Sequence, residues 1–186
     1  MQRLFGLIVF ALASAANAQV FVENFDSSVA GWDSYPSAGQ EQFSSEDLNG
    51  SLTSGSAEVT AVTNEHGVRR CVDTNIPAGV VDFGMYGFLP VSNTAVGQTV
   101  QCTFTLYLSD GCVSALGSFN TAAVPASGIW ANTAATTNAI VVVESVFAQC
   151  GVGSGNVNPG DVVRVDRIYV GPDGTLPVEL MLFGVD

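Results

Sequence analysis

The sequence predicts an all-β fold, an antiparallel β-sandwich. Three observations lead to this class. Short runs rich in Val, Ile, Thr and aromatic residues recur along the chain, turn residues separate these runs, and long helical periodicity is absent. About eight such runs at this spacing are typical of a sandwich built from antiparallel strands.

The first half of the chain contains four expected strands, at residues 20–25, 56–62, 68–74 and 82–91. Each run is rich in β-branched or aromatic side chains, which fit a half-buried pleated surface. Asn49-Gly50 marks a tight reversal before the second run, because both residues tolerate a positive φ. Residues 35–56 are rich in Ser, Thr, Ala and Asn, and we expect a long loop or an edge strand there.

The second half contains four more expected strands, at residues 99–108, 139–149, 161–170 and 177–185. The run 99–108 alternates apolar and polar side chains, so that Phe104 and Tyr107 face opposite ways. Residues 115–138 have the same polar composition as 35–56 and are again expected to form a long loop or an edge strand. Turns are expected at 110–111, 158–161 and 173–174.

The N-terminal residues 1–18 have the pattern of a signal peptide. Arg3 precedes a short apolar run, and Ala16-Asn17-Ala18 is a small-x-small cleavage site. The apolar run is too short to span a bilayer as a helix. We therefore expect a secreted protein, periplasmic or extracellular, with one domain over residues 19–172 and a C-terminal strand or tail over 173–186.

The charge balance excludes several classes of partner. The chain has 17 acidic side chains against 5 basic ones, all of them Arg, and a formal net charge of −12. Such a charge repels phosphate backbones and anionic lipid, so we expect no nucleic-acid partner and no electrostatic membrane binding. The balance is compatible with neutral sugars or with cations. The apolar content of 47% argues against a disordered chain.

The four cysteines indicate two disulfides, because an even number in an exported chain is typical of a disulfide framework. Four cysteines allow three connectivities, and spacing alone leaves them open. Cys-x-x-Cys pairs are absent and the chain has one His, which leaves little for a zinc site.

Several segments occur in an order that resembles a known family. Their sequences are "NFD" followed by Gly31-Trp32, "RRCVDT" (69–74), "DFGMYGFLP" (82–90), "CTFTLYLSDGCVSALG" (102–117) and "VVRVDRIYVG" (162–171). In this order they resemble the carbohydrate-binding-module-like, or galactose-binding-like, jelly-roll domains of secreted bacterial proteins. The resemblance covers most of residues 20–171. The "ATTNA" stretch departs from the Pro-x-Gly-Ala that the family has before its long apolar strand.

The resemblance implies a jelly-roll sandwich without catalytic activity that binds carbohydrate or serves adhesion. It also implies a disulfide between Cys71 and Cys112. Cys102 and Cys150 are additions to the family's pattern, and we expect them to pair with each other.

A calcium site is a second implication. The first and last strands of a jelly roll are neighbours, so Glu23 and Asp26 are expected near Asp166, where the family often holds a structural Ca²⁺. A hard cation of this kind takes six to eight oxygen ligands. The alternative, which the sequence leaves open, is solvent exposure or an ion pair with one of the arginines that flank Asp166, Arg164 and Arg167.

Sugar binding in this fold class uses aromatic rings that stack on the sugar, together with amides and acids that bind its hydroxyl groups. We single out four aromatic residues as candidate ligand-binding residues, Trp32, Tyr35, Tyr107 and Trp130, from a set that also contains Tyr86 and Tyr169. Both tryptophans match positions that the family mostly uses for packing, so the resemblance favours core packing over ligand binding for each of them. Tyr35 lies in an expected loop and is expected to be exposed.

Catalysis finds little support in the sequence. A hydrolytic triad needs a base, and His66 stands alone in "NEHGVRR", where we expect a solvated loop residue. The alternative function is a structural one, a subunit of an extracellular filament or surface layer that forms homo-oligomers through strand or tail pairing. The absence of Lys supports it, since Lys on edge strands normally blocks edge-to-edge pairing.

Overall fold

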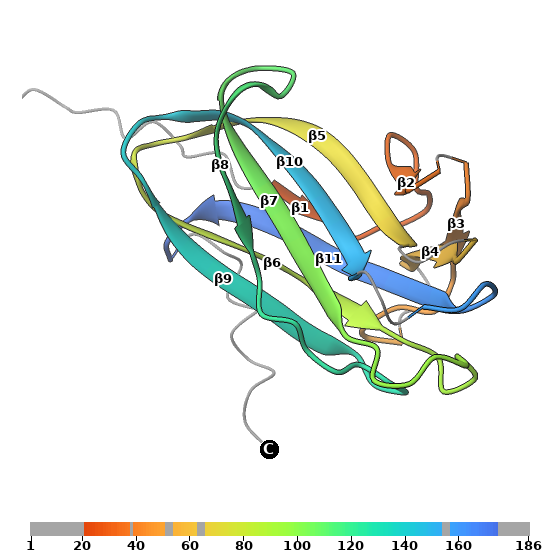
Figure 1. Cartoon of the computed structure of the whole chain (residues 1–186). Coiled ribbons are helices and arrows are strands. Elements are labelled where there is room, and N and C mark those ends of the chain that lie inside the picture. Colours follow the sequence, from red (N-terminus) through yellow and green to blue (C-terminus); the bar gives the residue numbers. More distant parts are fainter. Residues whose placement is uncertain (1–20, 38, 51–53, 63–65, 154–156, 175–186) are drawn as a thin grey trace, which may run out of the picture.

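The computed structural model describes residues 21–37, 39–50, 54–62, 66–153 and 157–174. These residues form strands and turns, with no helix among them and hence none that could cross a membrane. The strands build two antiparallel sheets that pack face to face (Figure 1). This is the β-sandwich predicted from the sequence.

Sheet A contains six strands, and β11 (Val162–Pro172) lies at its centre. Along one side of β11 the partner is β6, and along the other side the partners are first β4 and then β1. The other strands are β1 (Phe21–Glu23), β3 (Glu41–Ser44), β4 (Ser56–Thr60), β6 (Gly79–Phe88) and β9 (Ala131–Ala139), in the order β3-β4-β11-β6-β9 with β1 beside β11.

Sheet B contains five strands, in the order β2-β5-β10-β7-β8. Its strands are β2 (Asp33–Tyr35), β5 (His66–Ile76), β7 (Val100–Ser109), β8 (Val113–Asn120) and β10 (Val143–Val152). The view of Figure 1 looks onto the outer face of this sheet, with sheet A behind it.

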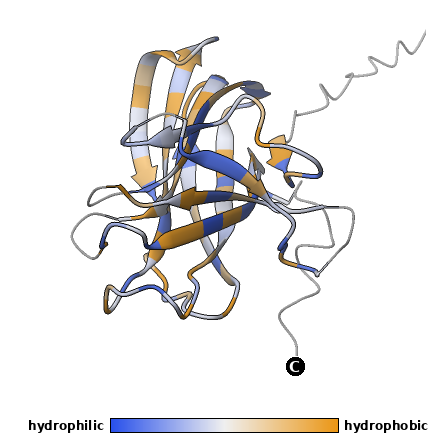
Figure 2. Ribbon diagram, turned by 90° about the vertical axis from the view of Figure 1, so that its right-hand side faces the viewer, coloured by the Kyte–Doolittle hydropathy of each residue, from blue (hydrophilic) through white to orange (hydrophobic). Residues whose placement is uncertain are grey.

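The core lies between the two sheets, because alternate side chains of each strand point inward. Bands of high and low hydropathy along the strands show this alternation (Figure 2). Phe83 of β6 and Phe104 of β7 meet across the interface, with ring centroids 4.8 Å apart. Both side chains are fully buried. In sheet B, the residues between these inward-pointing ones lie on the outer face of the sheet, where the candidate site is found.

The expected strands are found with shifted ends. The expected pairing of the first and last strands is confirmed, since Glu23 of β1 is the register partner of Ile168 of β11. The polar segment 35–56 contains the edge strand β3, and 115–138 contains parts of the edge strands β8 and β9. The apolar run expected at 139–149 begins later, at Val143, because residues 140–142 form the turn from β9. The strand expected at 177–185 lies outside the described residues.

Both disulfides join the cysteines expected to pair. Cys71 and Cys112 are bonded with their Cα atoms 6.0 Å apart, and Cys102 and Cys150 with theirs 4.1 Å apart. Cys102 of β7 and Cys150 of β10 are register partners with fully buried side chains. One disulfide is therefore part of the core, and the other lies on the outer face of sheet B.

His66 is not the solvated loop residue expected from the sequence. It begins β5, points inward, and is 1% exposed, with neither ring nitrogen hydrogen-bonded to a described residue. Burial lowers the pKa of His66 to about 4, against a smaller opposing effect of Asp161. The expectation failed because the polar neighbours of His66 in the sequence gave no sign that its strand extends to this residue.

Candidate functional site

The outer face of sheet B presents three cross-strand rows of side chains. Pairing of β5 with β10 and of β10 with β7 sets these rows, because directly opposed residues point to the same face. The first row is Asp33, Arg69, Gln149, Thr103 and Asn120, the second is Cys71, Phe147, Thr105 and Ser118, and the third is Asp73, Ser145 and Tyr107. We call this surface the B face.

One end of the B face is closed by Tyr35. Its ring lies over the paired glycines Gly67 and Gly151: a Cβ atom added to Gly67 would lie 2.7 Å from Tyr35 Cε1, and one added to Gly151 would lie 2.8 Å from Tyr35 Oη. The two strands need glycine here because any side chain would occupy the place of the ring. Tyr35 is 7% exposed, so the expectation of an exposed loop residue was wrong.

The other end of the B face is bounded by the turn between β7 and β8. The disulfide holds Cys112 of this turn to Cys71 on β5. The backbone N–H of Gly111 donates to Asp73 Oδ1 over 2.7 Å, and the N–H of Cys112 donates to Ser145 Oγ over 2.9 Å. The turn is therefore fixed to outward side chains of two neighbouring strands.

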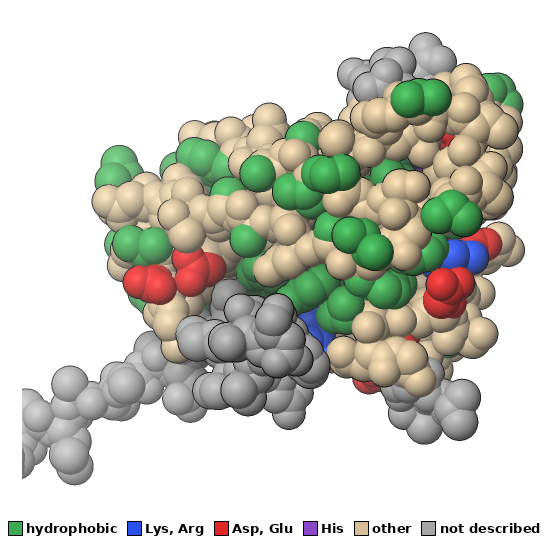
Figure 3. Space-filling view, turned by 90° about the horizontal axis from the view of Figure 1, so that it is seen from below, with side chains coloured by type: hydrophobic (Ala, Val, Ile, Leu, Met, Phe, Trp, Pro, Cys, Tyr) green, Lys and Arg blue, Asp and Glu red, His purple; other side chains and the backbone are tan. Residues whose placement is uncertain are grey.

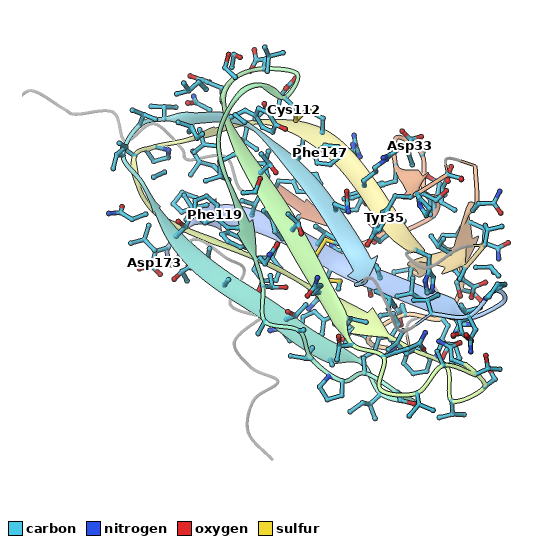
Figure 4. All side chains as sticks on the ribbon, viewed as in Figure 1. Asp33, Tyr35, Cys112, Phe119, Phe147 and Asp173 are labelled. Carbon is cyan, nitrogen blue, oxygen red and sulfur yellow. A yellow bond between two sulfur atoms is a disulfide. The ribbon has the colours of Figure 1, made fainter. Side chains whose placement is uncertain are left out.

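Between these two ends lie the side chains that can contact a ligand. Phe147 stands on β10 between Cys112 and Tyr35 (Figure 4). Arg69 and Thr103 flank Gln149 in the neighbouring row. Arg69 forms no ion pair with any described residue, whereas Arg70 and Arg164 do. Its guanidinium group is thus available to a ligand.

Hydrogen bonds within the sheet order the polar side of this face. Thr103 Oγ1 donates to Asn120 Oδ1 over 2.7 Å, and the hydroxyl groups of Thr105 and Ser118 are 2.8 Å apart. These hydroxyl and amide groups, with the amide of Gln149 and the guanidinium group of Arg69 beside them, can donate to and accept from sugar hydroxyl groups. The negative face of an aromatic ring such as that of Phe147 attracts the polarised C–H groups of a sugar.

The four predicted ligand-binding residues do not form one site. Tyr107 lies on the B face, as its strand parity predicted. Tyr35 lies at the end of the same face but is buried. Trp130 precedes β9 in the other sheet and lines a hollow there. Trp32 is a core residue, 3% exposed, with its ring centroid 5.5 Å from that of Phe25.

The three predicted calcium ligands are also not gathered. No three His, Cys, Asp or Glu side chains within the described parts of the chain form a group that could hold a metal ion. The Glu23 carboxylate accepts from Trp32 Nε1 and from the Phe25 N–H, each over 3.1 Å, and contacts Arg70 Nη1 at 3.4 Å. The arginine partner is thus Arg70 and not either of the two that flank Asp166.

Asp166 and Asp26 have separate surroundings. Asp26 is exposed. Asp166 is buried, and its two oxygens accept the backbone N–H groups of Leu48, over 3.1 Å, and of Arg167, over 2.6 Å. Burial raises the pKa of the Asp166 carboxyl to about 6. Asp166 therefore anchors the turn after β3 to the central strand of sheet A, and calcium binding stays a prediction.

Sequence reasoning missed three residues of the B face, Arg69, Phe147 and Gln149. The segment 139–149 looked uniformly apolar, which hid its alternation. The parity of "VESVFAQCGV" would have found two of them, because Phe147 and Gln149 alternate with Val146, Ala148 and Cys150, which are buried.

Comparisons with known proteins define the fold. Neither a family model nor a curated protein matches the sequence. Among solved structures, the chain is similar to the CBM22-1 xylan-binding domain of Paenibacillus barcinonensis Xyn10C, with a TM-score of 0.55 and 14% identity over 83% of this chain and 94% of that one. It is also similar to a xylan-binding domain from CBM 22, with a TM-score of 0.56 and 12% identity over 87% and 99%.

A third similar structure is that of the CBM22-1–GH10 modules of Clostridium thermocellum endo-1,4-β-D-xylanase 10B complexed with xylohexaose. Its TM-score is 0.57, with 12% identity over 86% of this chain and 29% of that one. The chain therefore has the jelly-roll β-sandwich fold of carbohydrate-binding modules, as its resemblance to this class implied.

Proposed function

We propose that this chain is a secreted, non-catalytic carbohydrate-binding module that binds a neutral glycan across the B face. The observation that carries the proposal is the row Arg69, Gln149 and Thr103 beside the ring of Phe147. Ligand sites of this kind combine an apolar contact surface with a few well-placed polar groups. The fold shared with xylan-binding domains supports the same ligand class.

A neutral glycan fits the charge of the protein better than an acidic one. The formal net charge is −12, and two acidic residues, Asp33 and Asp73, lie in the rows of the B face. A polysaccharide rich in uronic acid would be repelled over distances up to about 10 Å at moderate salt. Arg69 alone offers a positive charge there, and its fork of N–H donors also suits hydroxyl oxygens.

The surroundings of the acid and base candidates support a non-catalytic role. His66 is buried inside the sandwich, away from the B face. Asp166 has a raised pKa, but both of its oxygens are bound to backbone N–H groups and it is 5% exposed. A general acid has to reach the proton acceptor of its substrate, which Asp166 does not.

Native affinity electrophoresis tests this function. The gels contain soluble xylan, β-glucan, galactomannan or, as the acidic comparison, polygalacturonate. We expect retardation by at least one neutral polysaccharide and none by polygalacturonate. Loss of the ring in Phe147→Ala should weaken binding about tenfold, which corresponds to about 1.4 kcal/mol. Gln149→Ala should weaken it about threefold to tenfold, as expected for a lost hydrogen bond.

The matched control is Ile140→Ala. Ile140 is 86% exposed in the turn between β9 and β10, so its truncation also removes exposed apolar surface but leaves the B face unchanged. Retardation that is equal in all of these variants would contradict the assignment of the B face. Absence of retardation by every neutral polysaccharide would contradict carbohydrate binding itself.

The second candidate function is assembly into an extracellular filament or layer. The edge strand β8 supports it, because Val113 is 59% exposed and Leu116 is 40% exposed on a strand with one free edge. Unprotected apolar edges favour strand pairing between copies. Light scattering over a range of protein concentrations tests it: growth of oligomers that Leu116→Lys abolishes supports assembly, and a constant monomer contradicts it.

A further inference from the structure

A second aromatic surface lies on the opposite side of the sandwich. A hollow of about 450 Å³ on the outer face of sheet A is lined by Leu48, Asn49, Tyr86 and Trp130. Tyr86 points outward there because its neighbour Met85 is buried in the core. In the view from below, hydrophobic side chains gather between acidic side chains at one end and a basic side chain beside acidic ones at the other (Figure 3).

The ring of Trp130 is held in place by a stack. Its centroid is 5.4 Å from that of Phe88, and Arg164 Cζ lies 5.6 Å from the Phe88 ring on β6. Arg164 is in turn fixed by Glu58, at 2.7 Å, and by Glu46, at 2.9 Å. A half-exposed indole in such a stack loses little conformational freedom when a ligand covers it.

The polar wall of the hollow is fixed as well. Leu48 donates its backbone N–H to Asp166 on the central strand, which holds the turn that carries Asn49. The exposed Asn49 amide has both donors and acceptors for hydroxyl groups. Asp166, which is also a predicted calcium ligand, thus positions one side of the hollow.

The aromatic surface extends along the strands. A second hollow of about 510 Å³ is lined by residues that include Asp82, Tyr169 and Asp173. Tyr169 lies over Gly84 of β6, two residues from Tyr86, since a Cβ atom added to Gly84 would lie 2.5 Å from Tyr169 Oη. Burial first, and then the nearby Tyr86, raise the pKa of Tyr169 to about 12. Asp82 and Asp173 place negative charge at the far end, which disfavours an anionic ligand.

We propose that this outer face of sheet A is a second glycan-binding site, in which Trp130 and Tyr86 stack on a neutral sugar and Asn49 hydrogen-bonds its hydroxyl groups. The ligand class is that of the proposed function, on which this inference rests. Because the two sites lie on opposite faces of one sandwich, one domain can hold two glycan chains or two segments of one chain. Binding at two sites raises the apparent affinity for a polysaccharide above that for an oligosaccharide.

Tryptophan fluorescence isolates the second site. The chain has two tryptophans, and Trp32 is 3% exposed with its indole N–H bound to Glu23. Because Trp32 is buried, a sugar can cover only the ring of Trp130 directly. A change in emission caused by such contact therefore comes from Trp130. The probes are xylohexaose and cellohexaose, added to the mature, oxidised chain. We expect a saturable change in emission that persists in Trp32→Phe and disappears in Trp130→Phe.

Variants separate this site from the B face. The double variant Phe147→Ala/Gln149→Ala should keep the fluorescence response, while Tyr86→Ala and Asn49→Ala should weaken it about tenfold and about threefold. Loss of the response in the double variant would overturn the proposal, because the signal would then come from the B face. A chain that is retarded in affinity gels but gives no response to either probe would also overturn it, with the B face intact.

Two other occupants of the hollow would give different results. Emission that changes with protein concentration alone would assign the hollow to a second copy of the chain. Emission that changes when residues 175–186 are deleted would assign it to the end of the same chain. Either result without a response to sugar would overturn the proposal.

Discussion

The backbone N–H of Leu48 donates to the carboxylate of Asp166, and this bond joins the turn after β3 to the central strand of sheet A. The carboxylate is buried, with its pKa raised to about 6. Asp166 therefore combines two effects of opposite sign. It satisfies backbone donors that would otherwise be unpaired, and it carries a charge that burial makes unfavourable.

Asp166 should make the protein more stable as the pH falls. Its pKa is raised in the folded state from an ordinary value of 3.8 to about 6, so its contribution to stability is full below pH 3.8 and is lost as the pH rises through 6. The difference corresponds to about 3 kcal/mol. Urea unfolding of the wild type and of Asp166→Asn across this range measures it. The advantage of the wild type over the variant should grow toward acid, and a pH-independent difference would contradict the burial of this charge.

His66 should have the opposite effect. Its pKa is lowered in the folded state from an ordinary 6.5 to about 4, so its contribution is present above pH 6.5 and is lost as the pH falls through 4. The loss amounts to about 3 kcal/mol because a proton must be taken up inside the sandwich. The free energy of unfolding of His66→Gln should therefore not show this acid-dependent loss. Equal acid sensitivity in the wild type and the variant would show that His66 is solvated.

The two disulfides should differ in their effect on binding. Each closes a long loop, with sequence separations of 41 and 48 residues, and should stabilise the fold by about 4 kcal/mol in the chain-entropy model. Replacing Cys71 and Cys112 by Ser also frees the turn that bounds the B face, so glycan affinity should fall. Replacing Cys102 and Cys150 by Ala should lower stability but leave affinity unchanged. Equal affinities in both double variants would contradict the role given to the turn.

Calcium binding by Glu23, Asp26 and Asp166 stays a prediction of the resemblance. An ion that binds only the folded chain raises the melting temperature by mass action. On that prediction, calcium raises the melting temperature relative to chelator, and Asp166→Ala abolishes the rise. If calcium and chelator give the same melting temperature, the contacts of Glu23 with Arg70 and Trp32 are the whole role of this corner.

The fold followed from the sequence because strand signals are local. Period-two alternation at 99–108 and paired turn residues need no knowledge of distant partners, and β7 is found almost where it was expected. Strand ends were less accurate, since β5 extends to His66 through register pairing with Val152 of β10. Pairing of this kind depends on a partner 86 residues away, which no local pattern contains.

The candidate site followed only in part. Parity placed Tyr107 on the outer face of its strand, but the burial of Tyr35 depends on Gly67 and Gly151, which come from two other strands. Arg70 forms an ion pair and Arg69 forms none with a described residue, because neighbouring residues on a strand point to opposite faces. Residue type and spacing along the sequence therefore identify candidate residues, and the register of the sheet decides which of them lie together.

Mapping the glycan contact surface by NMR tests directly whether the B face binds the glycan. The ¹⁵N-labelled wild-type chain is titrated with the neutral oligosaccharide that matches the polysaccharide retained in the affinity gels. If the glycan binds across the B face, the largest shifts fall on β5, β7 and β10, including the side-chain amide of Gln149, and Phe147→Ala weakens them. Saturable shifts confined to residues outside the B face, or no shifts at any sugar concentration, would contradict it.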